Sequence, residues 1–221
     1  MTDEADSKGI LRDRRPLPPE LGFIAETSAR IVASTEVDDF YGISENSPYF
    51  RTFHGTRDFK LPMIAEEGLR AFMEHSRMAP KIYATVNPLQ AARHAFYNGP
   101  HDTLRSRGDI TGESVAGNPI VLMIQLDKQW LRSNPDSQKP IDSPYLISWS
   151  SDGRMIKVDT RLEGFKRCLK DDVEALKRGD ELSSFGLPLP ADHIPQDFIF
   201  VVAPEGNIPI DQYSITTTAV A

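Results

Sequence analysis

A strand-like run that ends in a histidine and a glycine is the feature that most constrains this chain. Apolar and aromatic residues from Phe50 onward give way to a polar ring and a residue without a Cβ at Phe53-His54-Gly55-Thr56. Glycine lets another group approach the main-chain N–H and C=O unobstructed. The pair His54 and Gly55 therefore predicts a strand end at which a planar ligand can lie against bare backbone.

Short elements with clear boundaries follow this run. Residues 63–69 predict a short amphipathic helix that ends at a glycine, and residues 81–85 predict a strand that carries Tyr83. A helix then starts at Asn87-Pro88, because asparagine can cap and proline has the fixed φ of a first helical turn. Gly99-Pro100 predicts its end. Its alanine-rich face is narrow, so we expect it to lie close to the preceding strand.

This ordered set resembles the ADP-ribosyltransferase superfamily, in the branch related to diphtheria toxin and the poly-ADP-ribose polymerases. Members of that branch have a His-Gly-Ser/Thr strand end, an I-x-x-x-G-L helix, a tyrosine strand and an alanine-rich helix in this order. The resemblance covers roughly a quarter of the chain, and its specificity comes from order and spacing. The matching residues here are His54-Gly55-Thr56, Ile64 to Gly68-Leu69, Tyr83 and Ala91-Ala92-Ala95.

The resemblance implies a site for NAD, which would be a substrate. In that family the histidine hydrogen-bonds a ribose hydroxyl of NAD, the backbone of the adjacent glycine holds the nicotinamide amide, and the tyrosine stacks on the nicotinamide ring. The resemblance thus assigns these roles to His54, Gly55 and Tyr83. Arg51 and Thr56, on either side of the His-Gly pair, are plausible second-line contacts to phosphate and ribose.

The fold that the resemblance implies is α+β, with split antiparallel β-sheets around an NAD cleft. We expect that domain over residues 49–221, preceded by a flexible N-terminus and helical extension over residues 1–48. Residues 20–32 carry apolar positions at helical spacing. The polar stretch 99–118 is a candidate substrate loop or a mobile connection. Periodicity predicts a buried strand, a hairpin, an amphipathic helix and a final strand at 119–126, 144–158, 160–182 and 197–202.

The third site residue of the family is commonly a glutamate at the start of a late strand, before an Ile-Pro turn that Ile194-Pro195 resembles. At that place residues 184–188 contain no acid. Glu181 ranks first among the nearby acids because it could open the strand; the alternative is a solvated glutamate at a helix end. Asp192 and Glu205 rank after it. Members without the glutamate are usually limited to a single transfer, use unusual acceptors or are inactive, so chain elongation into polymer is disfavoured.

Composition and charge limit the kinds of partner that the protein can bind and the compartment in which it can work. A net charge of −7 and a pI near 5.3 disfavour a nucleic-acid partner, because phosphate contacts require a basic face. The single cysteine, Cys168, excludes a disulfide framework and a cysteine-rich zinc site, and we propose no metal. No run approaches the ~18 apolar residues of a membrane span. We expect a soluble protein that is cytoplasmic or is secreted into a host cell as an effector or toxin.

The leading hypothesis is therefore a mono-ADP-ribosyltransferase, a pentosyl-transferring glycosyltransferase. It would move ADP-ribose from NAD to a macromolecule, with a protein as the favoured acceptor, and release nicotinamide. Three alternatives remain open. The first is an NAD-dependent RNA 2′-phosphotransferase, although its phosphate-binding arginines and N-terminal L-R-H helix are not evident. The others are a catalytically inactive domain that binds NAD or a partner, and a hydrolase that releases free ADP-ribose.

Overall fold

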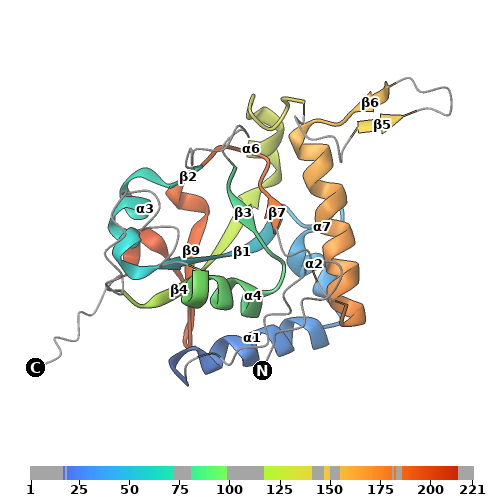
Figure 1. Ribbon diagram of the computed structural model, residues 1–221. Helices are drawn as coiled ribbons and strands as arrows, with labels where there is room; N and C mark the ends of the chain where they lie inside the picture. Colours follow the sequence, from blue (N-terminus) through green and yellow to red (C-terminus); the bar gives the residue numbers. More distant parts are fainter. Residues whose placement is uncertain are drawn as a thin grey trace, which may run out of the picture.

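A four-stranded antiparallel sheet forms the centre of the fold (Figure 1). The computed structural model describes residues 17, 19–71, 81–98, 117–140, 147–149, 155–180, 182 and 186–213. The continuous apolar run of strand β4 (Pro119–Asp127) suits its central position, because that strand is covered on both faces. Together with the surrounding helices, the sheet confirms the expected α+β class. Its strand order is β1 (Tyr49–Arg57), β4 (Pro119–Asp127), β9 (Ile199–Ala203) and β10 (Gly206–Pro209).

Three two-stranded sheets accompany the central one, and one of them is tied to its edge. Phe53 in β1 and Thr85 form an isolated bridge, in which each N–H donates to the other residue's carbonyl at 2.7 and 2.8 Å. This bridge fixes the strand that carries Tyr83 against β1. The small sheets are β2 (Leu69–Arg70) with β8 (His193–Ile194), β3 (Tyr83–Ala84) with β7 (Leu187–Pro188), and β5 (Ile147–Trp149) with β6 (Met155–Val158).

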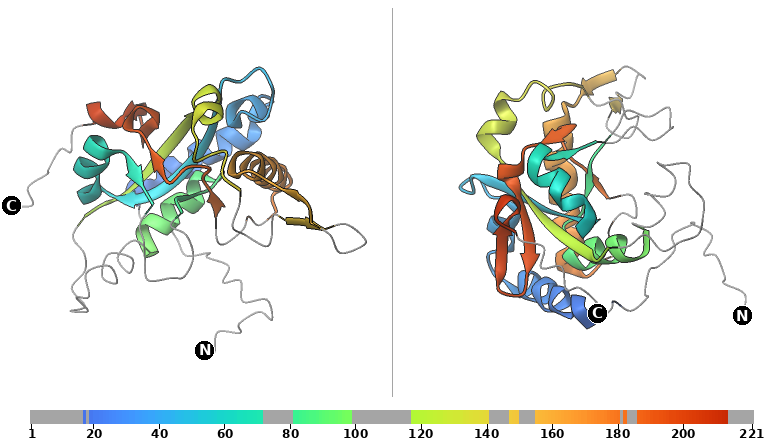
Figure 2. Two further views of the ribbon diagram at one scale, coloured as in Figure 1. Left: turned by 90° about the horizontal axis from the view of Figure 1, so that it is seen from above. Right: turned by 90° about the vertical axis from the view of Figure 1, so that its left-hand side faces the viewer.

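Helices cover both faces of the central sheet. Figure 2 shows α3 with the C-terminal 3-10 turns at one end of the sheet and α7 at the other. Among the described residues, no helix is long and apolar enough to cross a membrane. The helices are α1 (Gly22–Ala33), α2 (Val37–Tyr41), α3 (Leu61–Glu67), α4 (Pro88–Arg93), α6 (Lys128–Ser133) and α7 (Arg161–Arg178). The other turns are η1 (Pro19–Leu21), η2 (Asp58–Lys60), the π-helical η3 (His94–Asn98), η5 (Gln196–Phe198) and η6 (Ile210–Gln212).

The predicted helix boundaries are confirmed where they rest on local chemistry. The Asn87 side chain accepts a hydrogen bond from the N–H of Leu89, and Pro88 opens α4. The short helix α3 ends at Gly68, whose φ of +75° is a left-handed value that favours glycine. The N-terminal helix also lies where its spacing predicts it. The described part of that extension belongs to the same hydrophobic core as the sheet, through Leu21, Ile24, Val37 and Tyr41.

Tyr41 joins this N-terminal part to the chain that follows β3. Its ring is fully buried, and its hydroxyl donates to the carbonyl oxygen of Val86. Burial also raises the pKa of Tyr41, so the hydroxyl remains protonated and continues to donate. The bond fixes the position at which the chain leaves the tyrosine strand and enters α4.

The first prediction concerns this buried hydroxyl. Tyr41→Phe is expected to lower the free energy of unfolding by about 1–3 kcal/mol, because the Val86 carbonyl would remain buried without its donor. Urea denaturation measures the change. Tyr213→Phe is the matched control and should change stability by less than about 0.5 kcal/mol, since its ring is partly exposed. Equal effects of the two substitutions would contradict this role of the hydroxyl.

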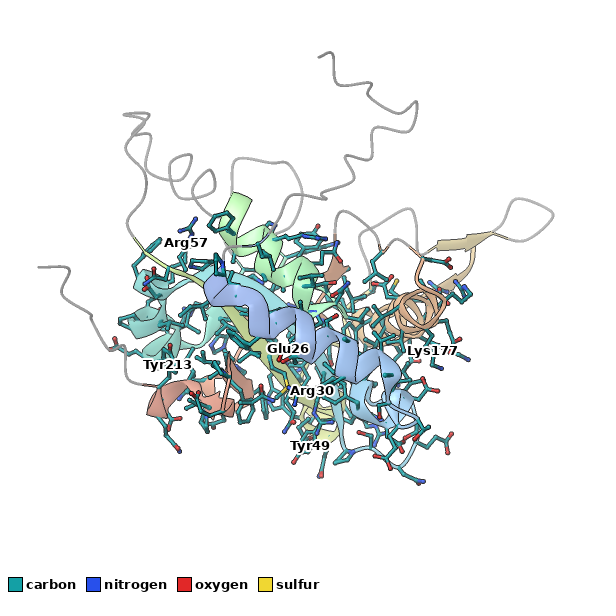
Figure 3. The ribbon with its side chains drawn as sticks, turned by 90° about the horizontal axis from the view of Figure 1, so that it is seen from below. Glu26, Arg30, Tyr49, Arg57, Lys177 and Tyr213 are labelled. Carbon is teal, nitrogen blue, oxygen red and sulfur yellow. The ribbon has the colours of Figure 1, made fainter. Side chains whose placement is uncertain are left out.

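One arginine closes the end of the α4 region. The guanidinium of Arg57 donates from Nε to the carbonyl of Ala95 at 3.0 Å and from Nη2 to that of Phe96 at 2.9 Å. Its Nη1 donates to the carbonyl of Gly117 at 2.6 Å, just before β4. These bonds satisfy carbonyls that a helix end leaves without internal partners. Arg57 therefore joins the end of the helix to the start of the central strand (Figure 3).

A carboxylate on α7 gives the protein a distinct pH dependence. Burial raises the pKa of Asp172 to about 6, from an ordinary value of 3.8, and the neighbouring Asp171 adds to the rise. The folded protein therefore binds more protons than the unfolded chain between these values, and the stability due to this group is lost as the pH rises through about 6.

The second prediction follows from this loss of stability as the pH rises. Asp172→Asn is expected to raise the free energy of unfolding at about pH 7 by on the order of 1 kcal/mol, after allowance for solvent screening, and to leave it unchanged near about pH 4. Chemical denaturation at both pH values tests this. Glu205→Gln, an exposed substitution on the turn after β9, should shift neither value. A variant that is less stable at the higher pH would refute the burial argument.

Candidate functional site

The structure brings His54 and Tyr83 together, although they are 29 residues apart in the sequence. The bridge between Phe53 and Thr85 aligns β1 with the tyrosine strand. Nδ1 of His54 then lies 2.8 Å from the carbonyl oxygen of Tyr83. A carbonyl oxygen only accepts, so Nδ1 carries the proton and donates. In the neutral ring Nε2 is then the acceptor nitrogen, which suits a bond from a hydroxyl group.

The ring of Tyr83 is exposed while its backbone is fixed. Tyr83 is 44% exposed, which places it among the few large apolar or aromatic residues at the surface of the described structure. Its main chain pairs with Pro188 of β7 on one side and accepts from His54 on the other. Gly186 lies next to it, since a Cβ there would stand 3.6 Å from the Tyr83 Cβ. A rigid strand therefore presents an aromatic face on which a flat ligand can stack.

Gly55 has two separate consequences for this region. A Cβ at this position would stand 1.9 Å from the carbonyl oxygen of Ala91 and 2.9 Å from the nitrogen of Ala95. The glycine thus permits α4 and the following turn to lie directly on β1. Phe53 directs its own N–H and C=O to Thr85, so the alternation of an antiparallel ladder directs those of Gly55 to the same outer edge.

The two flanking candidates lie on different faces of β1. Successive strand residues point to opposite faces, so Arg51 and His54 diverge, whereas Thr56 shares the face of His54. Thr56 is 5% exposed. Arg51 instead donates from Nε to Gln125 Oε1 at 2.7 Å and from Nη1 to the Phe40 carbonyl at 2.9 Å. The structure therefore brings Thr56, but not Arg51, to the side of the predicted site.

The candidate third residue cannot be placed with these. Glu181 lies outside the described residues, between the end of α7 and the start of β7. Asp192, ranked after it, forms an ion pair with Arg161 in which Nη1 and Oδ1 are 2.6 Å apart. Glu205 lies on the exposed turn between β9 and β10. Within the described chain, the acids ranked after Glu181 are thus in an ion pair or on an exposed turn.

A cavity lies on the other face of β1, and the sequence did not indicate it. Its volume is about 470 Å³, and it is an open hollow lined by residues of α1, α2 and the central sheet. Arg51 is the one predicted site residue that lines it. The spacing of its residues on α1 is helical and could have suggested a shared face, but not what that face covers. The lining residues are Thr27, Arg30, Ile31, Ser34, Glu36, Asp39, Phe40, Arg51, Phe53, Met123 and Asn207.

Neither the described side chains nor a comparison with known proteins directly identifies a ligand for the His54–Tyr83 site or for the cavity. Among the residues that the structure describes, no group of three or more histidine, cysteine or acidic side chains could hold a metal ion. Comparison with other proteins adds no relative from which a role could be taken. No family model, no curated protein and no solved structure matches the chain.

Proposed function

We propose that this protein is an NAD-dependent mono-ADP-ribosyltransferase whose NAD site includes His54, Gly55 and Tyr83. The observation that supports the proposal is the 2.8 Å hydrogen bond from His54 Nδ1 to the Tyr83 carbonyl. It joins the two residues of the proposed site that lie farthest apart in the sequence. The outer edge of β1 at Gly55 lies next to them. In this proposal NAD binds between the central sheet and the β3–β7 pair, which would make the finer fold a split pair of sheets around NAD.

Each residue supplies one property that the reaction needs. The exposed ring of Tyr83 stacks on the nicotinamide, and the outward N–H and C=O of Gly55 pair with its carboxamide, which is both a donor and an acceptor. Nε2 of His54 accepts a ribose hydroxyl, as its tautomer allows. These contacts hold the ribose and the leaving group in a fixed relative orientation.

The reaction itself breaks one bond and forms one. The bond between ribose C1′ and the nicotinamide nitrogen breaks, and its electron pair leaves with the nicotinamide, which becomes neutral. Positive charge develops on the ribose, so a nearby carboxylate would stabilise the transition state. Glu181 remains the candidate for that role. A nucleophile on the acceptor, for which we favour a protein, attacks C1′ and releases its proton.

A second candidate function is an NAD-binding domain without turnover. The observation that favours it is the ion pair between Asp192 and Arg161, which engages the acid just before the Ile194-Pro195 turn. Such a domain would keep the contacts to nicotinamide and ribose but would lack a carboxylate opposite the developing charge. The two candidates differ in the fate of NAD and can therefore be separated by experiment.

The test is incubation of the purified chain with NAD labelled in the adenylate part, together with a cell lysate. A transferase releases nicotinamide and labels a macromolecule, and sensitivity of the label to protease or to ribonuclease identifies the acceptor class. Free labelled ADP-ribose without acceptor labelling indicates a hydrolase. Binding by calorimetry without consumption indicates the second candidate. If the chain neither binds nor consumes NAD, both candidates are refuted.

A further inference from the structure

Four charged side chains line the cavity between α1, α2 and the sheet without pairing with one another. They are Arg30 on α1, which Figure 3 labels, Arg51 on β1, Glu36 and Asp39. Within the described part of the chain, none of the four takes part in an ion pair. Their neighbour Asp38 does, because Lys177 Nζ lies 2.9 Å from its carboxylate. Two of the four have hydrogen-bond partners instead: Arg30 donates to the Thr27 hydroxyl at 3.2 Å, and Asp39 accepts from the Ser44 hydroxyl.

Arg51 is held in place as a binding group would be. Two of its N–H donors are occupied by Gln125 and by the Phe40 carbonyl, and its Cζ lies 5.4 Å from the centre of the Phe40 ring. These contacts fix the plane of the guanidinium, which has further donors for an anion. Burial lowers the pKa of Arg51, in agreement with its partial removal from water.

Two aromatic residues contribute to the lining, of which Phe40 is partly exposed and Phe53 is 1% exposed. The rings of Phe40 and Phe53 are stacked with their centres 6.4 Å apart and an angle of 18° between their planes. Asn207, also in the lining, donates from Nδ2 to the sulfur of Met123 at 3.4 Å. A thioether is a weak acceptor, so this amide retains the capacity to bind a ligand. The lining therefore offers cations, anions, an amide and a flat apolar surface together.

From this lining we infer that the cavity binds a small zwitterion of the aromatic amino-acid class. Its carboxylate pairs with Arg51 and Arg30, its ammonium group with Glu36 and Asp39, and its ring packs on Phe40. The four protein charges sum to zero, so a phosphate dianion would meet two carboxylates and a simple amine would meet two guanidiniums. The volume of about 470 Å³ is typical of sites for small molecules. The inference does not depend on the proposed transferase activity.

Calorimetric titration with three related probes tests the inference. L-Phenylalanine carries both charges, 2-phenylethylamine lacks the carboxylate, and N-acetyl-L-phenylalanine lacks the ammonium group. We expect L-phenylalanine to bind at least about tenfold more tightly than either of the others. No binding of L-phenylalanine, or equal binding of all three probes, would overturn the proposal.

Two variants test which protein side chain pairs with each charge of the ligand. Glu36→Gln should remove most of the preference for L-phenylalanine over its N-acetyl form, and Arg51→Met most of the preference over 2-phenylethylamine. Because Arg51 also bonds to the Phe40 carbonyl, Glu36→Gln is the variant that keeps the test independent of folding. Glu66→Gln, an exposed charge removal on α3, is the control and should bind like the native chain. A Glu36→Gln protein that discriminates as the native one does would also overturn the proposal.

Discussion

Replacing His54 or Tyr83 by alanine is expected to reduce transfer of ADP-ribose from NAD by at least about 100-fold. For His54 the reason is the loss of a positioned acceptor for the ribose hydroxyl, because a misplaced substrate can react on the order of 100-fold more slowly. For Tyr83 it is the loss of the ring on which the nicotinamide stacks. Rates of nicotinamide release and of acceptor labelling, measured over a range of NAD concentrations, test both substitutions.

Conservative variants and a matched surface residue make this test specific. Tyr83→Phe should retain most of the activity, because it preserves the ring while the hydrogen bond from His54 goes to the main chain. Phe59→Ala removes another exposed aromatic ring, 39% exposed against 44% for Tyr83, and should leave activity unchanged. Undiminished transfer by the Tyr83→Ala protein would refute the proposed site.

Adding one methyl group at Gly55 is expected to cost more stability than any other single substitution considered for this protein. The Cβ would stand 1.9 Å from the Ala91 carbonyl oxygen, an atom of the helix backbone that no side-chain rotation can move away. Helix α4 would have to lift from β1. We expect Gly55→Ala to lower the free energy of unfolding by about 3 kcal/mol or more, as measured by urea denaturation.

The control for this substitution lies at the start of α1. A Cβ at Gly22 would meet no atom within 4 Å, and its position at a helix start tolerates alanine. Gly22→Ala is expected to leave stability unchanged within about 0.5 kcal/mol or to raise it slightly. If Gly55→Ala were equally tolerated, the close approach of α4 to β1 would be wrong. If the Gly55→Ala protein were stable but did not carry out the proposed transfer, the loss would be assigned to the proposed contacts of the Gly55 N–H and C=O with NAD.

Local chemistry explains which parts of the fold could be predicted from the sequence. The start of α4 needs only Asn87 and Pro88, and that of α7 only its Thr160 cap. Helix α7 ends at Arg178, four residues before the predicted end at residue 182, because Gly179 takes the αL conformation. Each boundary is decided by groups within a few residues of one another. Strand β10 was not predicted, because Gly206 and Pro209 at its two ends are residues that disfavour a strand.

The site shows what such local patterns leave out. The contact between His54 and Tyr83 depends on the bridge between two strands, which only the fold creates. The divergence of Arg51 from His54 could have been foreseen, because residues three apart on a strand point to opposite faces. The cavity could not, since its lining joins residues between 27 and 53 to Met123 and Asn207, which are far from them in the sequence. Nor does any motif mark Arg57, whose partners lie up to 60 residues away.

The three bonds of Arg57 have a consequence for how this protein could diversify. Its guanidinium holds the carbonyls of Ala95 and Phe96 on one side and that of Gly117 on the other. The stretch of chain between Phe96 and Gly117 therefore departs from and returns to a single side chain. The entropic cost of joining two points that the fold already holds together grows only slowly with the number of residues between them. This stretch could therefore be replaced by one of different length and sequence without a change to the core.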